Sequence, residues 1–343
     1  MPAAGDPGVI NSPKHMLSNT HNRLSLALVL EARERIRGKV NRTPIFTSHT
    51  LDALSSARLF FKCENLQKCG AFKARGATNA VFSLSEQEAS RGVVTHSSGN
   101  HAAALAQAAK LRDIRAYVVM PESAPKAKQA SVRRYGGEVI LCESTLEARE
   151  STAQRVIQQT GAVLIHPYND LRVMAGQGTI ALELLEDVPD LDIILCPVGG
   201  GGQLSGIAVA AKSIKPDIQV IGVEPIGADD ASRSFKAGYL IPSVNPQSIA
   251  GGLLTSLGDK TFAEIRSYVH DIVTVPEEAI VRAMREIWEV MKLIVEPSGA
   301  VSYAALVCGK LAAKNKRIAL ILSGGNLDLD RLPWQIKAEE IGA

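Results

Sequence analysis

Residues 68–80, with the sequence KCGAFKARGATNA, constrain the fold of this chain more than any other segment. An apolar run ending at Phe61 precedes them and predicts a strand, and apolar residues at helical spacing then predict a helix. Lys73 lies at this junction, between Phe72 and Ala74. A lysine in a small apolar pocket loses hydration, which lowers its pKa and favours the neutral amine that attacks a carbonyl. Taken alone, however, the segment is better explained by an ordinary exposed lysine at a helix start.

Apolar runs alternate with alanine-rich helical segments along most of the chain. The predicted strands are residues 92–95, 114–120, 138–142, 162–165, 193–198, 220–223 and 316–322, and the predicted helices are residues 101–110, 127–135, 146–160, 178–185 and 207–212. This alternation favours βαβ units and an α/β fold, with parallel or mixed sheets flanked by helices. Because 343 residues exceed what one core usually supports, we expect two lobes with an active site between them.

Composition and charge argue against several classes of protein. A net charge of +3, without a basic stripe interleaved with aromatic residues, argues against a nucleic-acid partner. The five cysteines show no paired spacing and indicate reduced thiols. Residues 24–30 are apolar but run into a charged amphipathic helix without a cleavage site, and no apolar run could span a bilayer. We therefore expect a cytoplasmic protein without a membrane partner, with a mobile tail at residues 1–22.

Residues 97–101, with the sequence SSGNH, predict an anion site. They connect a predicted strand to a predicted helix, so backbone N–H groups, serine hydroxyls and an amide gather at a helix start. A helix N-cap alone would need only one of these residues. The run therefore favours a site for a carboxylate.

Residues 199–206, with the sequence GGGGQLSG, follow a predicted buried strand and suit a phosphate. They also support a rival interpretation. Gly200, Gly202 and Gly206 have a dinucleotide-like spacing, and Glu224 ends the next predicted strand where a ribose-binding acid would lie. An NAD-binding domain would use this turn but would need neither the lysine junction nor the serine-rich turn.

Ser323 opens a turn, SGGN, that follows the last predicted strand. A serine hydroxyl there can bond a ring nitrogen without protonating it, although a simple type I turn explains the sequence equally well. Together the segments offer an amine for an aldehyde, a carboxylate site, a phosphate site and a partner for a ring nitrogen. Pyridoxal phosphate with an amino-acid substrate accounts for all four features, whereas NAD accounts for one.

The motifs AFKARG, HSSGNH, GGGG, EPSGA and SGGN resemble the serine racemase and threonine dehydratase branch of the fold-type II pyridoxal-phosphate enzymes. The resemblance covers residues 32–328 and is strongest to serine racemases of the plant type. It implies a two-lobed α/β fold like that of the tryptophan synthase beta subunit. Residues 23–90 and 170–343 would form a large cofactor-binding domain, and residues 91–169 an inserted, mobile small domain. It also implies a homodimer.

The resemblance assigns roles to individual residues. Lys73 would carry the cofactor and act as the base on one face of the substrate Cα, and Ser98 would be the acid and base on the opposite face. The implied cofactor-binding residues are Phe72, Lys73, Asn100, Gly199, Gly200, Gly201, Gly202, Gln203, Gly252, Glu296 and Ser323. The implied substrate-binding residues are Ser97, Ser98, Asn100, His101 and Arg149.

Two further sites follow from the same resemblance. The family's divalent cation site falls on Glu224, Asp230 and the carbonyl of Ala228, where oxygen ligands suit Mg²⁺ or Ca²⁺, with Mn²⁺ as a further candidate. A solvated turn would also explain this acidic pair. Lys68, Lys128 and Asn326 match the segments that contact nucleotide in mammalian racemases, so ATP is a candidate activator.

The implied activity is racemisation of L-serine to D-serine, together with dehydration of either enantiomer to pyruvate and ammonia, in D-amino acid metabolism. Departures from the family pattern leave the substrate open. Tyr168 follows His166 and Pro167, at a position where mammalian racemases have asparagine. A tyrosine at this position resembles plant and microbial members, which include 3-hydroxyaspartate dehydratases. Gly251 replaces a usual aspartate, and Cys69 a common threonine. The alternatives are a 3-hydroxyaspartate or threonine dehydratase, or a ligand-sensing relative without turnover.

Overall fold

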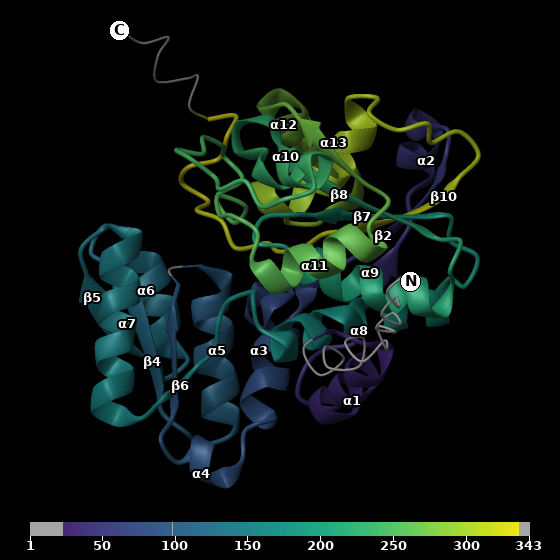
Figure 1. Ribbon diagram of the computed structural model, residues 1–343. Coiled ribbons are helices and arrows are strands. Elements are labelled where there is room, and N and C mark those ends of the chain that lie inside the picture. The colour runs from purple at the N-terminus through teal and green to yellow at the C-terminus, as the bar shows by residue number, and fades with distance from the viewer. Residues whose placement is uncertain (1–22, 98, 336–343) are drawn as a thin grey trace, which may run out of the picture.

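A six-stranded sheet organises most of the computed structural model, which describes residues 23–97 and 99–335 (Figure 1). In spatial order its strands are β1 (Ile45–Phe46), β2 (Arg58–Lys62), β10 (Arg317–Ile321), β7 (Ile193–Pro197), β8 (Gln219–Pro225) and β9 (Asp271–Val275). Neighbouring strands are parallel except for the edge pair β1 and β2. Segments from both halves of the chain therefore lie side by side, since β10 runs between β2 and β7.

Helices cover both faces of this sheet because its strands are buried on both sides. In β7, Ile194 and Cys196 join a core that includes side chains of α1 (Leu26–Ile36), α8 (Leu171–Asp187), α9 (Gly202–Ile214) and α11 (Asp259–Tyr268). The alternate residues Ile193 and Leu195 join a second core with α2 (His49–Ser55), α12 (Glu277–Glu286) and α13 (Pro297–Val307). Because successive side chains of a strand point to opposite faces of the sheet, this one apolar run packs against helices on both faces.

A second sheet, with four parallel strands, lies apart from the six-stranded sheet (Figure 1). Its strands, in spatial order, are β5 (Glu138–Cys142), β4 (Ala116–Pro121), β3 (Val93–His96) and β6 (Val163–Leu164). Tyr117 and Val119 of β4 pack on one face with α7 (Leu146–Thr160). Val118 and Met120 pack on the other face with α5 (Asn100–Leu111) and α6 (Lys126–Arg134).

Helix α3 (Lys73–Phe82) lies between the two sheets and contacts both α5 and α8. Its approach to α8 is close, because a Cβ on Gly176 would lie 2.6 Å from the Cα of Gly76. A buried ion cluster fixes the start of the helix: the Arg75 guanidinium donates to Glu64 at 2.8 Å and to Glu183 at 2.7 Å. The position of the residues that begin α3 is therefore set by several long-range contacts.

The predicted α/β architecture, with parallel sheets flanked by helices, is confirmed. All four strands of the smaller sheet fall within residues 91–169, but the division into a large and a small domain stays a prediction. The expected tail at residues 1–22 lies outside the described residues. Within residues 23–97 and 99–335, none of the helices has both the length and the apolar composition that a bilayer-spanning helix needs.

Candidate active site

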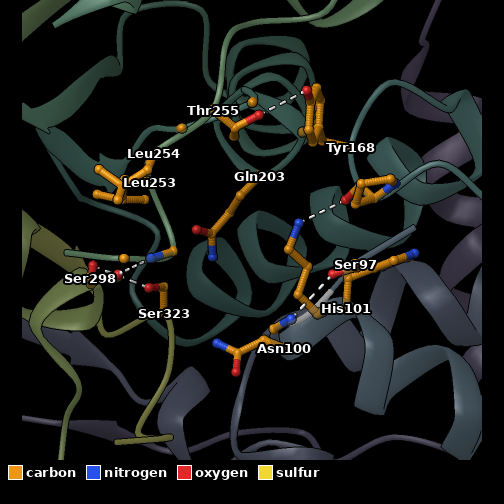
Figure 2. Close-up of a pocket in the computed structure, with 18 of the residues that line it drawn as sticks. Ser97, Asn100, His101, Tyr168, Gln203, Leu253, Leu254, Thr255, Ser298 and Ser323 are labelled. Atoms are coloured by element: carbon orange, nitrogen blue, oxygen red, sulfur yellow. Dashed lines mark hydrogen bonds between the residues drawn. The ribbon is translucent and has the colours of Figure 1, made fainter. Parts of the chain in front are cut away.

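A cavity of about 450 Å³ lies where α3, the start of α5, the glycine-rich turn between β7 and α9 and the turn after β10 meet (Figure 2). It brings together most of the predicted cofactor and substrate residues, namely Phe72, Lys73, Ser97, Asn100, His101, Arg149, Gly199, Gly200, Gly201, Gly202, Gln203, Gly252, Glu296 and Ser323. Lys128 and Asn326 also line it, whereas Lys68, Glu224, Ala228 and Asp230 do not. Ser98 lies outside the described residues.

Lys73 is the first residue of α3, and it lines the cavity. Its Nζ donates a hydrogen bond to the carbonyl of Pro167 at 2.7 Å and lies 5.1 Å from the centre of the Phe72 ring. No carboxylate lies within ion-pair distance of it among the described residues. Burial lowers the pKa of Lys73 to about 8, because desolvation penalises the ammonium form. The amine is thus suited to nucleophilic attack near neutral pH.

The glycine-rich turn presents the N-terminus of α9 to the cavity. Gly201 has φ +85°, a conformation that favours glycine, and α9 begins at Gly202. The side-chain Nε2 of Gln203 is buried without a hydrogen-bond partner. Free N–H groups at a helix start and an unpaired amide donor together suit an anion such as a phosphate.

Asn100 connects the start of α5 to two turns of the larger sheet. Its Nδ2 donates to Glu296 Oε1 at 2.7 Å, and its Oδ1 accepts from Asn326 Nδ2 at 3.0 Å. Burial raises the pKa of Glu296 to about 7, with the Asn100 hydrogen bond acting in the opposite direction. One Nδ2 hydrogen of Asn100 remains for a ligand.

The tautomers of two histidines follow from their partners. His101 Nε2 lies 3.2 Å from the carbonyl of Ile165, which can only accept, so Nε2 carries the hydrogen. His101 Nδ1 is then a bare acceptor, and burial holds the pKa of this ring well below its usual value. His166 Nδ1 accepts from the backbone N–H of Asn169 at 2.9 Å, and burial lowers the pKa of His166 to about 4. The lowered pKa values favour the neutral form of both rings. With its Nδ1 accepting, His166 carries its hydrogen on Nε2, so both His166 and the Ser97 hydroxyl can donate to a ligand in the cavity.

Ser323 and Ser298 lie next to each other in the wall of the cavity (Figure 2). The Ser323 hydroxyl lies 3.4 Å from the carbonyl of Ser298, and the Ser298 hydroxyl accepts from the Gly252 N–H at 2.9 Å. Ser298 was not among the predicted site residues, although the EPSGA motif contains it. A serine hydroxyl at this place can pair with a ring nitrogen and leave it without a proton.

Glu224 and Asp230 form a separate acidic pair, both almost fully buried. Glu224 accepts from the N–H of Ser232 at 2.6 Å, while Asp230 Oδ2 has no partner. Burial raises the pKa of Glu224 to about 8 and that of Asp230 to about 6. The described residues contain no group of three His, Cys, Asp or Glu side chains arranged for a metal, so any ion would also need carbonyl or water oxygens.

Comparison with known proteins relates most of the chain to one family. The family model described as "Pyridoxal-phosphate dependent enzyme" matches residues 36–324. A serine racemase of Arabidopsis thaliana is 52% identical over 309 residues, which are 89% of this chain and 93% of that protein. A beta-hydroxyaspartate dehydratase of Paracoccus denitrificans (strain Pd 1222) is 50% identical over 306 residues, 89% of this chain and 97% of its own. The solved structure of maize serine racemase superposes with a TM-score of 0.88 at 46% identity, covering 93% of this chain and 98% of that one.

Proposed function

This chain belongs to the family of pyridoxal-phosphate dependent enzymes, and we propose that it is a serine racemase that also dehydrates serine. The observation that carries the proposal is the single cavity in which a desolvated lysine, a glycine-rich helix start and Ser323 converge. The fold is that of the fold-type II enzymes, as in the maize racemase structure. Relatives named serine racemase, from plants to mammals, match about nine-tenths of this chain.

The residues present fit pyridoxal phosphate. Lys73 would carry it covalently, Gly199–Gly202 with Gln203 would hold its phosphate, and Ser323 would face its ring nitrogen. Phe72 and Gly252 would line its ring, with Asn100 and Glu296 at the ring edge. When bound, the cofactor supplies an electron sink for negative charge that develops at the substrate Cα.

The side chains of this protein would then handle the protons. Lys73 would remove or return the Cα proton on the face from which it projects, because its pKa of about 8 lets it exchange protons near neutral pH. Ser97, His101 and Arg149 border the space for the substrate, and the Ser97 hydroxyl would hold the carboxylate. Ser98 would serve the opposite face. Return of the proton there gives racemisation, and departure of the β-hydroxyl gives dehydration.

A second candidate function is dehydration of 3-hydroxyaspartate. The 50% identical Paracoccus denitrificans relative carries that name, and Tyr168 borders the cavity. Threonine dehydration is a third possibility on the same scaffold, and a ligand-sensing role without turnover is the non-enzymatic alternative. The enzymatic candidates share the chemistry at Cα, so they differ in the β-substituent of the substrate that the cavity accepts.

A substrate panel tests the proposed function. The purified holoenzyme would be incubated separately with L-serine, D-serine, L-threonine and 3-hydroxyaspartate, and the enantiomers, keto acids and ammonia would be measured over time. We expect D-serine and pyruvate from L-serine at the highest kcat/KM. Faster oxaloacetate formation from 3-hydroxyaspartate would replace the proposal with the second candidate. A visible cofactor band that responds to L-serine without any product would indicate a sensor.

We also propose that Glu224, Asp230 and the carbonyl of Ala228 bind a divalent cation, Mg²⁺, Ca²⁺ or Mn²⁺. Two buried carboxylates with raised pKa values, one with an unpaired oxygen, support this site because an ion would compensate their desolvation.

EDTA is expected to lower the melting temperature and activity of the wild-type protein, and added Mg²⁺ should restore both. The reason is that an ion bound only to the native state stabilises it by about 2.7 kcal/mol at one hundred times its Kd. Asp230→Asn should melt at the same temperature with and without Mg²⁺. Differential scanning calorimetry of both proteins measures the melting temperatures. If neither EDTA nor added Mg²⁺ changes the melting temperature of the wild-type protein, the proposed cation site is wrong.

Three further predictions belong to this proposal. Residues 91–169 would move as a small domain over the cavity, and two chains would form a homodimer. ATP would act near Lys68, Lys128 and Asn326, of which Lys128 and Asn326 border the cavity. A cytoplasmic location remains an expectation from the sequence.

A further inference from the structure

We propose that Tyr168 is a positioning residue for the cofactor phosphate, and that its hydroxyl bond to Thr255 keeps the glycine-rich turn closed around that phosphate. The inference rests on the proposed use of pyridoxal phosphate. It concerns a residue outside all the motifs that identified the site.

Tyr168 occupies the space next to two glycines of the turn. A Cβ on Gly200 would lie 2.4 Å from Cγ of the Tyr168 ring, and a Cβ on Gly202 would lie 2.9 Å from the Tyr168 Cβ. Side-chain atoms do not approach so closely. These two positions therefore require glycine because of Tyr168, and the ring forms one wall of the turn.

The remaining walls come from two other segments. A Cβ on Gly199 would lie 2.9 Å from the backbone of Leu253, and one on Gly201 would meet Thr261 and Ile265 of α11 at 2.9 Å. The Thr261 hydroxyl also donates to the carbonyl of Gly200 at 2.8 Å. The turn is thus enclosed on several sides, one of which Tyr168 provides.

Contacts at both ends of its side chain hold Tyr168 in place. Its hydroxyl lies 3.0 Å from Thr255 Oγ1, as Figure 2 shows, and burial raises the pKa of this phenol so that it keeps its proton. Its ring packs edge-on against His166, with centres 4.5 Å apart. The Thr255 N–H in turn donates to the carbonyl of Leu253 at 2.9 Å. The bond between hydroxyls therefore ties the segment of Tyr168 to the wall beside Gly199.

The same short segment also contacts the reactive amine. Pro167 precedes Tyr168, and its carbonyl accepts from Lys73 Nζ at 2.7 Å. Residues 167 and 168 thus touch both places where the cofactor would be attached, the amine and the phosphate turn. Loosening Tyr168 should weaken the hold on the phosphate, without removing any group that transfers a proton.

The test compares Tyr168→Phe, Thr255→Val and the double variant by titrating each full-length protein with pyridoxal 5′-phosphate and with pyridoxal, which lacks the phosphate. Loss of one neutral hydrogen bond should weaken binding of the phosphate form about fivefold in each single variant. The double variant should bind no more weakly than either single variant, since both remove the same bond. Affinity for pyridoxal should remain unchanged.

Tyr303→Phe is the matched control, because the buried Tyr303 hydroxyl donates to Glu286 at 2.7 Å, outside the cavity. It should lower the melting temperature and leave both affinities at the wild-type value. The proposal is overturned if Tyr168→Phe binds pyridoxal 5′-phosphate as tightly as wild type, if both forms weaken equally, or if the two single effects multiply. A wild-type protein that binds no pyridoxal 5′-phosphate would instead overturn the proposed function.

Discussion

Lys73→Ala is expected to give a folded protein that has lost the visible absorbance of lysine-bound cofactor and whose turnover has fallen on the order of 10³-fold or more. Lys73 is the amine in the cavity that is both buried and of lowered pKa, and the substitution removes the nucleophile and the proposed base together. Among the described residues its Nζ bonds a backbone carbonyl and pairs with no carboxylate, so the fold should tolerate the loss. Absorbance spectra, circular dichroism and a coupled assay make the measurement. Retention of both the visible band and turnover would remove Lys73 from the mechanism.

The pH dependence of cofactor attachment provides a second check on Lys73 in the wild-type protein. Burial lowers its pKa from 10.5 to about 8, so the reactive neutral fraction increases with pH, reaches one half at about pH 8 and is nearly complete about one pH unit higher. The attachment rate should rise about tenfold per pH unit below this pKa and level off above it. Stopped-flow absorbance after mixing apoprotein with pyridoxal 5′-phosphate gives the rate. A rate that continued to rise through pH 10 would indicate an exposed lysine.

Elements with a strong local pattern were predictable from the sequence. The limits of β5 and α7 agree with the predicted residues 138–142 and 146–160, because apolar periodicity and flanking turn residues mark them locally. Strand β1 was missed, since its two residues form a strand only by pairing with β2. Helix α13 has small apolar residues on all sides, so no amphipathic period marks it, and its burial against both β7 and β10 is a tertiary property.

The features of the candidate site likewise divide into those that the sequence predicted and those that it did not. Lys73, the glycine-rich turn and Ser323 lie in short segments whose residue types indicate their chemistry, and the cavity contains all of them. The contact between Tyr168 and Thr255 joins residues 87 positions apart, and no sequence spacing marks it. The acceptor for the Lys73 amine is a backbone carbonyl, a group that every residue carries. Such contacts depend on how loops meet in the folded protein.

Ser98→Ala is expected to stop interconversion of the serine enantiomers while sparing elimination from L-serine. Racemisation needs one proton removed on one face of Cα and another delivered on the opposite face, and the Lys73 amine, which lines the cavity, can serve only one of the two faces. Elimination from L-serine needs only the lysine face, whereas elimination from D-serine needs the other. Loss of the second acid and base should slow both D-serine formation and D-serine elimination about 10² to 10⁴-fold.

The measurement follows L-serine, D-serine and pyruvate over time with each enantiomer as the starting substrate. Ser97→Ala is the matched control, because Ser97 borders the cavity in the same turn and its proposed role is to hold the carboxylate. Its loss should raise KM for both enantiomers and leave the ratio of their kcat values near that of wild type. Comparison of the two variants therefore separates a loss of proton transfer on one face of Cα from a loss of substrate binding that affects both enantiomers. If Ser98→Ala interconverts the enantiomers at the wild-type rate, Ser98 has no part in proton transfer, and the second proton must come from another group.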